Sequence, residues 1–201
     1  MDIKYYDLLS AAIIGVVVVA VVNHVFFDIV DIDSIAYIAF GYLVGYFINA
    51  IGSSLENIYY WSIGGAPYEE LLTIKSKQDW TGCKKVKFYE VRRLTETIKK
   101  ELDDPNASSH KMFECAKRKV NGCENSRVPA FNAQFAWSRT ILTTILISLF
   151  LFAFEYYGEW IFWVVSLLLL YISWKRFKER GYYYAREVFN EYLRQSSLSN
   201  D

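Results

Sequence analysis

The sequence predicts an all-α integral membrane protein with four transmembrane helices and a small helical cytoplasmic region. Three observations carry this prediction. Four long apolar runs are free of formal charge, with one pair toward each end of the chain. All 22 Lys and Arg residues fall on one side of the predicted membrane. The short connectors on the other side are purely acidic.

The first pair of apolar runs is long enough to cross a bilayer. Residues 8–27 are twenty positions without formal charge, and residues 34–52 are nineteen more. About 20 apolar residues in a helix span the hydrocarbon core of roughly 30 Å. A cleavable signal peptide is not expected, because Lys4 is the only base before the first run and no small-residue cleavage pattern follows it.

The second pair of runs is shorter, and we predict spans at residues 138–154 and 160–174. The uncharged stretches from Thr140 and from Trp160 hold fifteen residues each, and flanking aromatic residues extend them. A buried hairpin in a soluble core is the alternative for this pair. The one-sided distribution of bases favours the membrane.

Counts of Lys and Arg set the expected orientation. The connector at residues 28–33 holds three Asp residues and the connector at 155–159 holds two Glu residues, with no base in either. Residues 75–127 hold fourteen bases, and residues 175–194 hold six. Both termini and the central region are therefore predicted to be cytoplasmic, in a multi-pass protein of the plasma membrane.

The central region, residues 53–137, is expected to be a helical cytoplasmic layer. Apolar residues at helical spacing predict helices over residues 86–102 and 109–120. Residues 121–129 are expected to form a loop. These lengths suit a layer continuous with the spans better than a separately folding domain.

The start of this region shows where the second helix leaves the membrane. Tyr59, Tyr60 and Trp61 lie where an interfacial aromatic belt is expected. Gly64 and Gly65 follow, and we expect them to end the helix in a turn. A glycine pair can also cradle phosphate, but no nucleotide-binding fingerprint follows this one.

Residues 175–195 are predicted to continue the fourth span as a cytoplasmic helix. Its apolar stripe includes Phe177, Val188 and Phe189. Because this stripe is too apolar for an isolated exposed helix, we expect it to pack on the central region or on another subunit.

Small residues in the first two spans predict close helix packing. Gly41 and Gly45 form a GxxxG pair in the second span, and Ala11 and Gly15 form a similar pair in the first. Small side chains let helix backbones approach each other. The packing can be within one subunit or between subunits.

The third span carries a stripe of hydroxyl groups. Thr140, Thr144 and Ser148 recur every four residues and share one helix face. One interpretation is hydrogen bonding between helices or back to the helix's own carbonyls. The other is a weakly polar pore wall, repeated around a symmetric oligomer, without a recognisable selectivity filter.

Polar and aromatic residues alternate just before the third span. We interpret Phe131, Phe135 and Trp137 as residues of the headgroup boundary, with Arg139 reaching lipid phosphates. The remaining polar side chains of this segment can form hydrogen bonds with the backbone or with neighbouring helices where little water is present. Three of its residues are our interfacial or gating candidates: Asn132, Gln134 and Arg139.

Neither an enzyme nor a metalloprotein is expected. The chain has two His and three Cys residues (Cys83, Cys115 and Cys123), and their spacing lacks the tight CxxC or HxxxH pairs of zinc sites. No nucleophile, base and orienting group converge in the sequence. Secondary transport is also disfavoured, because there are only four spans and no acid or base lies deep within them, with Arg139 at the mouth of the third. We expect no catalytic residue, metal or cofactor.

Three short segments resemble small four-span bacterial membrane proteins of anti-phage defence loci, the Hailong-type membrane effector subunits. These segments are FNAQFAWSR before the third span, the late helix YYYAREVFNEYL, and the turn GGAPYEELL. The resemblance implies a homo-oligomer that conducts ions and depolarises the inner membrane. It also implies a cytoplasmic partner enzyme that holds the pore closed through a nucleotide or nucleic-acid signal.

The sequence thus predicts a homo-oligomeric membrane effector that forms a regulated ion channel or pore, in contact with membrane lipid. The fourteen bases of residues 75–127 can meet an anionic ligand, although an ordinary solvated cytoplasmic face explains them equally well. The alternative function is a non-conducting membrane anchor or scaffold that recruits a cytoplasmic partner.

Overall fold

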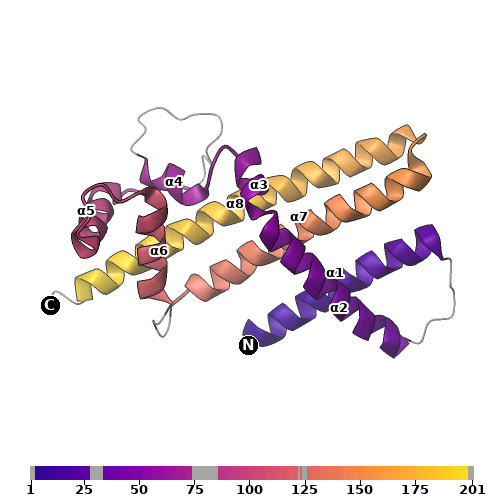
Figure 1. Cartoon of the computed structure of the whole chain (residues 1–201), viewed down its shortest axis with the longest axis horizontal. Helices are drawn as coiled ribbons and strands as arrows, with labels where there is room; N and C mark the ends of the chain where they lie inside the picture. The colour runs from indigo at the N-terminus through magenta and orange to yellow at the C-terminus, as the bar shows by residue number, and fades with distance from the viewer. Residues whose placement is uncertain (1–2, 28–33, 74–85, 122, 124–125, 199–201) are drawn as a thin grey trace. The chain divides into compact units, whose positions relative to one another are not determined.

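The computed structural model describes residues 3–27, 34–73, 86–121, 123 and 126–198, with side chains from residue 11 onward. Within these ranges every element of regular structure is an α-helix (Figure 1). The acidic connector at 28–33 and Cys83 lie outside the described residues.

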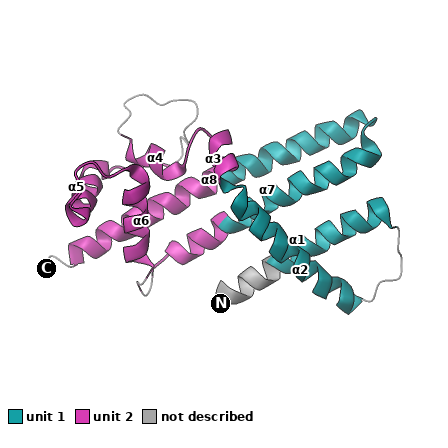
Figure 2. Cartoon of the chain, viewed as in Figure 1, with its two compact units in different colours: residues 1–56, 136–177 teal, residues 57–135, 178–201 magenta. Residues whose placement is uncertain are grey.

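The chain divides into two compact units, each assembled from separate stretches of sequence (Figure 2). Unit 1 comprises residues 1–56 and 136–177, and unit 2 comprises residues 57–135 and 178–201. Helices α7 (Val128–Tyr156) and α8 (Trp160–Leu198) each contribute residues to both units.

Three helices are long and apolar enough to cross a membrane: α2 (Ser34–Ser54), α7 and α8. Helix α1 (Ile3–Phe26) has a shorter described apolar part, Ala11–Phe26. The all-helical fold and the presence of apolar helices long enough to span a membrane are therefore as the sequence predicts. The first of the four predicted spans falls on α1 and stays a prediction.

Unit 1 has a narrow core and an apolar surface. Ile14 and Val18 of α1 and Ile48 of α2 form the core, and Ile141 and Ile147 of α7 pack against it. Large apolar side chains cover the outer faces of α2 and α8, among them Ile35, Ile38, Phe40, Leu43, Phe47, Ile161, Val164, Leu167, Leu168 and Ile172. Soluble proteins rarely expose such continuous apolar surface, and lipid is the solvent that suits it.

Unit 2 packs short helices against the ends of α7 and α8. The short helices are α3 (Glu56–Ser62), whose first residue belongs to unit 1, and α4 (Pro67–Leu72), α5 (Val91–Leu102) and α6 (Ser109–Val120). Val188, Phe189 and Tyr192 of α8 are fully buried there. The apolar stripe of the C-terminal helix thus packs on the central region of the same chain, the first of the two expected alternatives.

Some helix boundaries differ from the expected ones. Helix α5 begins at Val91 and not at residue 86, because the preceding residues contribute to the core in a non-helical conformation. Val86 is buried, and the centre of the Phe88 ring lies 5.7 Å from that of Phe189. Helix α7 begins at Val128 inside the expected loop, with Pro129 in its first turn, where its missing N–H costs little.

The glycine pair ends α3 as expected. Gly64 and Gly65 have φ angles of 91° and 126°, in the left-handed region that favours glycine. Two residues later Pro67 begins α4, with its fixed φ suited to a helix start. The chain therefore turns sharply within five residues of Ser62.

Candidate functional site

The small residues of α1 and α2 meet where the two helices cross within one chain. A Cβ added to Gly15 would collide with the carbonyl oxygen of Gly41, and one added to Gly45 would collide with that of Ala11. A Cβ on Gly41 would lie 2.9 Å from the backbone nitrogen of Val16. The structure thus brings the four predicted packing residues together, and the crossing leaves no room for larger side chains.

Polar groups gather where the C-terminal end of α2 meets α7 in unit 1. Thr140 Oγ1 donates to Asn49 Oδ1 at 3.0 Å. Arg139 forms an ion pair with Glu56, and these two side chains are only 12% and 26% exposed. Gly52 lies at the same contact between α2 and α7, because a Cβ added to it would be 2.7 Å from Thr143 Oγ1. We call Asn49, Gly52, Glu56, Arg139 and Thr140 the α2–α7 cluster.

The partner of Arg139 differs from the predicted one. The sequence suggested lipid phosphates, whereas the guanidinium pairs with the carboxylate of Glu56. A charge with so little exposed surface needs such a partner, and removing either member leaves the other uncompensated. Sequence reasoning missed Glu56. Its signal is position, because it lies four residues after the second predicted span, while Arg139 lies directly before the apolar run of the third.

The hydroxyl stripe of α7 is buried inside the unit. Thr140 and Thr144 donate to backbone oxygens of Ala136 and Thr140, both at 2.9 Å, and Thr143 donates to Arg139 O at 3.0 Å. Ser148 Oγ is buried and has no hydrogen-bond partner among the described residues. These contacts support helix packing, and a pore-lining role for Thr140, Thr144 and Ser148 stays a prediction.

One aromatic residue of the segment before the third span, Phe135, belongs to the core of unit 2. Phe135 is buried and stacks on Tyr60 and Tyr184, with ring centroids at 6.4 and 5.8 Å. Protein rings rather than lipid therefore surround it, and its predicted depth at the headgroup boundary stays a prediction. Asn132 and Gln134 are exposed, and Gln134 accepts a hydrogen bond from Arg180 of α8.

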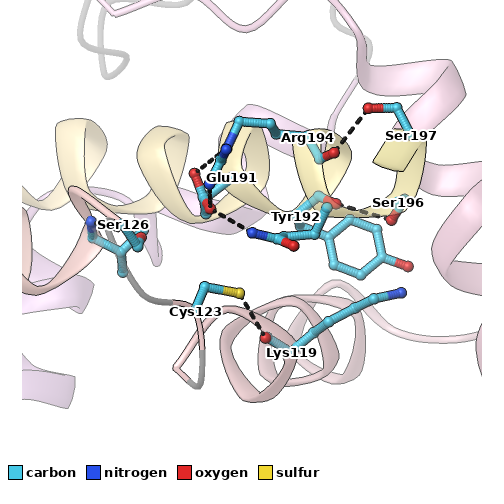
Figure 3. A network of polar contacts seen from close by, with 10 residues as sticks. Lys119, Cys123, Ser126, Glu191, Tyr192, Arg194, Ser196 and Ser197 are labelled. Carbon is cyan, nitrogen blue, oxygen red and sulfur yellow. Dashed lines mark hydrogen bonds and ion pairs between the residues drawn. The ribbon is translucent and has the colours of Figure 1, made fainter. Parts of the chain in front are cut away.

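A second polar cluster joins α5, α6 and α8 in unit 2. Glu101 Oε2 accepts from Lys119 Nζ at 2.8 Å and from the Tyr192 hydroxyl at 2.5 Å. The Lys119 ammonium also lies 4.9 Å from the centre of the Tyr192 ring, and both side chains can be followed in Figure 3. Burial raises the pKa of Glu101, but the hydrogen bonds from Lys119 and Tyr192 outweigh it, so the net pKa is lowered.

The two described cysteines, Cys115 and Cys123, are free thiols of intermediate burial. Burial and the nearby charge of Glu101 raise the pKa of the Cys115 thiol, which keeps it protonated. The Cys123 thiol donates to Lys119 O at 3.5 Å (Figure 3). Across the described ranges, no three His, Cys, Asp or Glu side chains lie close enough together to hold a metal ion.

We expect Glu101→Gln to make unit 2 less stable at neutral pH, by about 1 kcal/mol for a partly exposed charged hydrogen bond. Because the folded state lowers the pKa of Glu101, the stabilisation is present above the ordinary value of 4.5 and is lost as pH falls through the lowered one. Urea unfolding of wild type and Glu101→Gln should therefore differ at pH 7, and the difference should shrink as pH falls below 4.5.

The matched control is Glu96→Gln, an exposed carboxylate on the same helix. It should leave the urea midpoint unchanged at both pH values. A gap between wild type and Glu101→Gln that persists undiminished at pH 3 would show that the carboxylate charge is not what Lys119 and Tyr192 stabilise.

No protein-family model matches this chain, and neither does any curated protein or solved structure. The function proposed below therefore rests on the sequence and on the contacts described above.

Proposed function

We propose that the chain is a homo-oligomeric membrane effector that forms a regulated ion channel or pore. It lies in the bacterial inner membrane with both termini in the cytoplasm and acts in anti-phage defence. Three long apolar helices and the one-sided distribution of bases support the membrane position. The defence role rests on the sequence resemblance alone.

The observation that carries regulation is the sharing of α7 and α8 between the units. Each helix runs without a break across the boundary, at residues 135–136 in α7 and 177–178 in α8. A hydrogen-bonded helix moves as one body over short distances, so a ligand that shifts its cytoplasmic part also shifts its membrane part. A passive anchor does not require two continuous helices.

The α2–α7 cluster is the part of unit 1 best suited to respond. The Arg139–Glu56 ion pair and the Thr140–Asn49 hydrogen bond join α7 to α2 on the side of the membrane predicted to be cytoplasmic. A rotation of α7 would break both contacts and expose the hydroxyl stripe. The buried stripe thus corresponds to a closed state, and Asn132, Gln134 and Arg139 lie along the helix that would turn.

The second candidate function is a non-conducting scaffold. The satisfied hydroxyls of Thr140, Thr143 and Thr144 favour it, since they need no water-filled pore to explain them. In this case unit 2 would recruit a cytoplasmic partner, and the membrane helices would only hold it in place.

Ion flux separates the two functions. We would reconstitute the full chain in liposomes and compare wild type with Phe189→Ala, which loosens the core of unit 2, and with Tyr89→Ala, which removes an exposed ring from the same unit. For a channel governed by unit 2 we expect at least a tenfold change in flux with Phe189→Ala and none with Tyr89→Ala, at unchanged oligomer mass.

Absence of flux in all three proteins, with and without added nucleotides and short oligonucleotides, would reject the channel and favour the scaffold. Flux that is equal in all three would keep a pore but reject its control by unit 2.

A further inference from the structure

Helix α3 has one apolar face that the protein leaves uncovered. Trp61 is 83% exposed and Ile58 is 57% exposed, and their spacing of three residues puts them on the same side of the helix. The opposite side is used inside unit 2, where Tyr59 is 5% exposed and the Tyr60 ring stacks on Phe135. Of the three residues predicted to form an aromatic belt, Tyr59, Tyr60 and Trp61, only Trp61 is on the uncovered face. Ile58 lies beside it.

The length of α2 fixes where α3 begins relative to the bilayer. Helix α2 has 21 residues, which span about 31 Å at 1.5 Å per residue. That length matches the hydrocarbon core of about 30 Å, so Ser54 comes at its edge. Helix α3 starts two residues later, at Glu56.

The ion pair of Glu56 with Arg139 marks the same level independently. Charged groups are costly inside the hydrocarbon and belong at its boundary or beyond it. Since Glu56 is the first residue of α3, the next turn of this helix falls within the headgroup layer. Ile58 and Trp61 are on that turn.

The turn after α3 keeps this face outward. Gly64 and Gly65 reverse the chain with positive φ angles, and Ile63 is buried just before them. Turning Trp61 into the protein would pull Tyr59 and Ile63 out of the core of unit 2. The exposed side chains of Trp61 and Ile58 must therefore be covered by an apolar environment other than this chain's own core.

We propose that α3 is an interfacial anchor, in which Ile58 and Trp61 insert at the boundary between headgroups and acyl chains of the leaflet that α2 leaves. Tryptophan suits this layer because its ring is apolar while its indole N–H can still bond water or lipid oxygens. The anchor ties unit 2 to the lipid surface. It does so whether the protein conducts ions or serves as a scaffold.

The test measures depth at single spin labels in the full chain. Ile58→Cys and Trp61→Cys, in a background with the native cysteines replaced by Ser, are labelled with nitroxide and placed in phosphatidylethanolamine–phosphatidylglycerol vesicles. The accessibility to oxygen, which concentrates in lipid, is divided by that to a water-soluble nickel complex. We expect this ratio to be at least fivefold higher at 58 and 61 than at two exposed polar controls outside α3, Glu69→Cys and Glu96→Cys.

Ratios at 58 and 61 equal to those at the controls would overturn the anchor, because the face would then be in water. Shielding from both reagents would also overturn it, because a second protein surface would then cover the face. A label at Leu43, on the outer face of α2, tests membrane insertion separately and should be oxygen-rich. Insertion can thus fail or hold independently of the anchor.

A second measurement in the native-cysteine background guards against misfolded labelled variants. Amide exchange of residues 56–63 in vesicles should be at least threefold faster for Trp61→Ser than for Trp61→Phe, since phenylalanine keeps an apolar ring at the site. Equal rates for the two variants would count against lipid insertion of this side chain.

Discussion

Replacing Gly15 by Leu is expected to separate α1 from α2 and to lower the thermal stability of unit 1 strongly. A Cβ at this position would already collide with the carbonyl oxygen of Gly41, and backbone atoms cannot move aside as the end of a flexible side chain can. Overpacking in cores typically costs about 1–3 kcal/mol and sometimes more. Because backbone lies on the other side of this contact, we expect Gly15→Leu to lower the free energy of unfolding by at least about 3 kcal/mol.

The effect should be visible as a lower melting temperature in detergent micelles, followed by circular dichroism. For a chain of this size, 3 kcal/mol corresponds to a shift of roughly 6–12 °C. The matched control is Gly158→Leu, since an added Cβ there meets no atom within 4 Å. If both variants melted at the same temperature, α1 and α2 would not cross in the way described above.

The sequence predicts this crossing in part. The spacing of Gly41 with Gly45, and of Ala11 with Gly15, identifies surfaces where backbones can approach. It does not identify the partner, because a helix of the same chain and a helix of a second chain present the same small residues. The choice depends on the three-dimensional course of the chain, which the structure supplies.

The core of unit 2 was harder to predict, for a different reason. Phe135 lies before an apolar span, where a membrane-boundary aromatic and a core aromatic obey the same local pattern. Its contacts with Tyr60 and Tyr184 join positions 75 and 49 residues away along the chain. Helical periodicity covers only a few turns, so it carries no information on such distant pairs. The same limit hid Glu101, Lys119 and Tyr192 as one cluster.

Replacing Phe189 by Ala should destabilise unit 2 more than any surface change in it. The ring is fully buried and lies 5.7 Å from the rings of both Phe88 and Phe113. Removing a buried phenylalanine leaves a cavity and typically costs about 3–5 kcal/mol. Amide exchange in unit 2 should then be roughly 100-fold to 4000-fold faster, because each 1.4 kcal/mol is a factor of ten.

The aromatic control is Tyr89→Ala, whose ring is 85% exposed in the same unit. It should change exchange in unit 2 by less than a factor of three. Hydrogen exchange with mass spectrometry can follow peptides from α5 and α6 in both variants. Equal acceleration by the two substitutions would mean that Phe189 is not part of a packed core.

The order in which the chain is made gives the split composition of unit 2 a consequence for biosynthesis. Translation proceeds at about 5–20 residues per second, and early segments fold first. Residues 57–135 leave the ribosome well before residues 178–201, which carry Val188, Phe189 and Tyr192. Until then the short helices of unit 2 lack the side chains that fill their core. A chain that stopped just before residue 178 would keep the long apolar parts of α7 and α8 but lack the residues that fill the core of unit 2. We therefore expect unit 2 of such a chain to be open to proteases until the last turns of α8 are made.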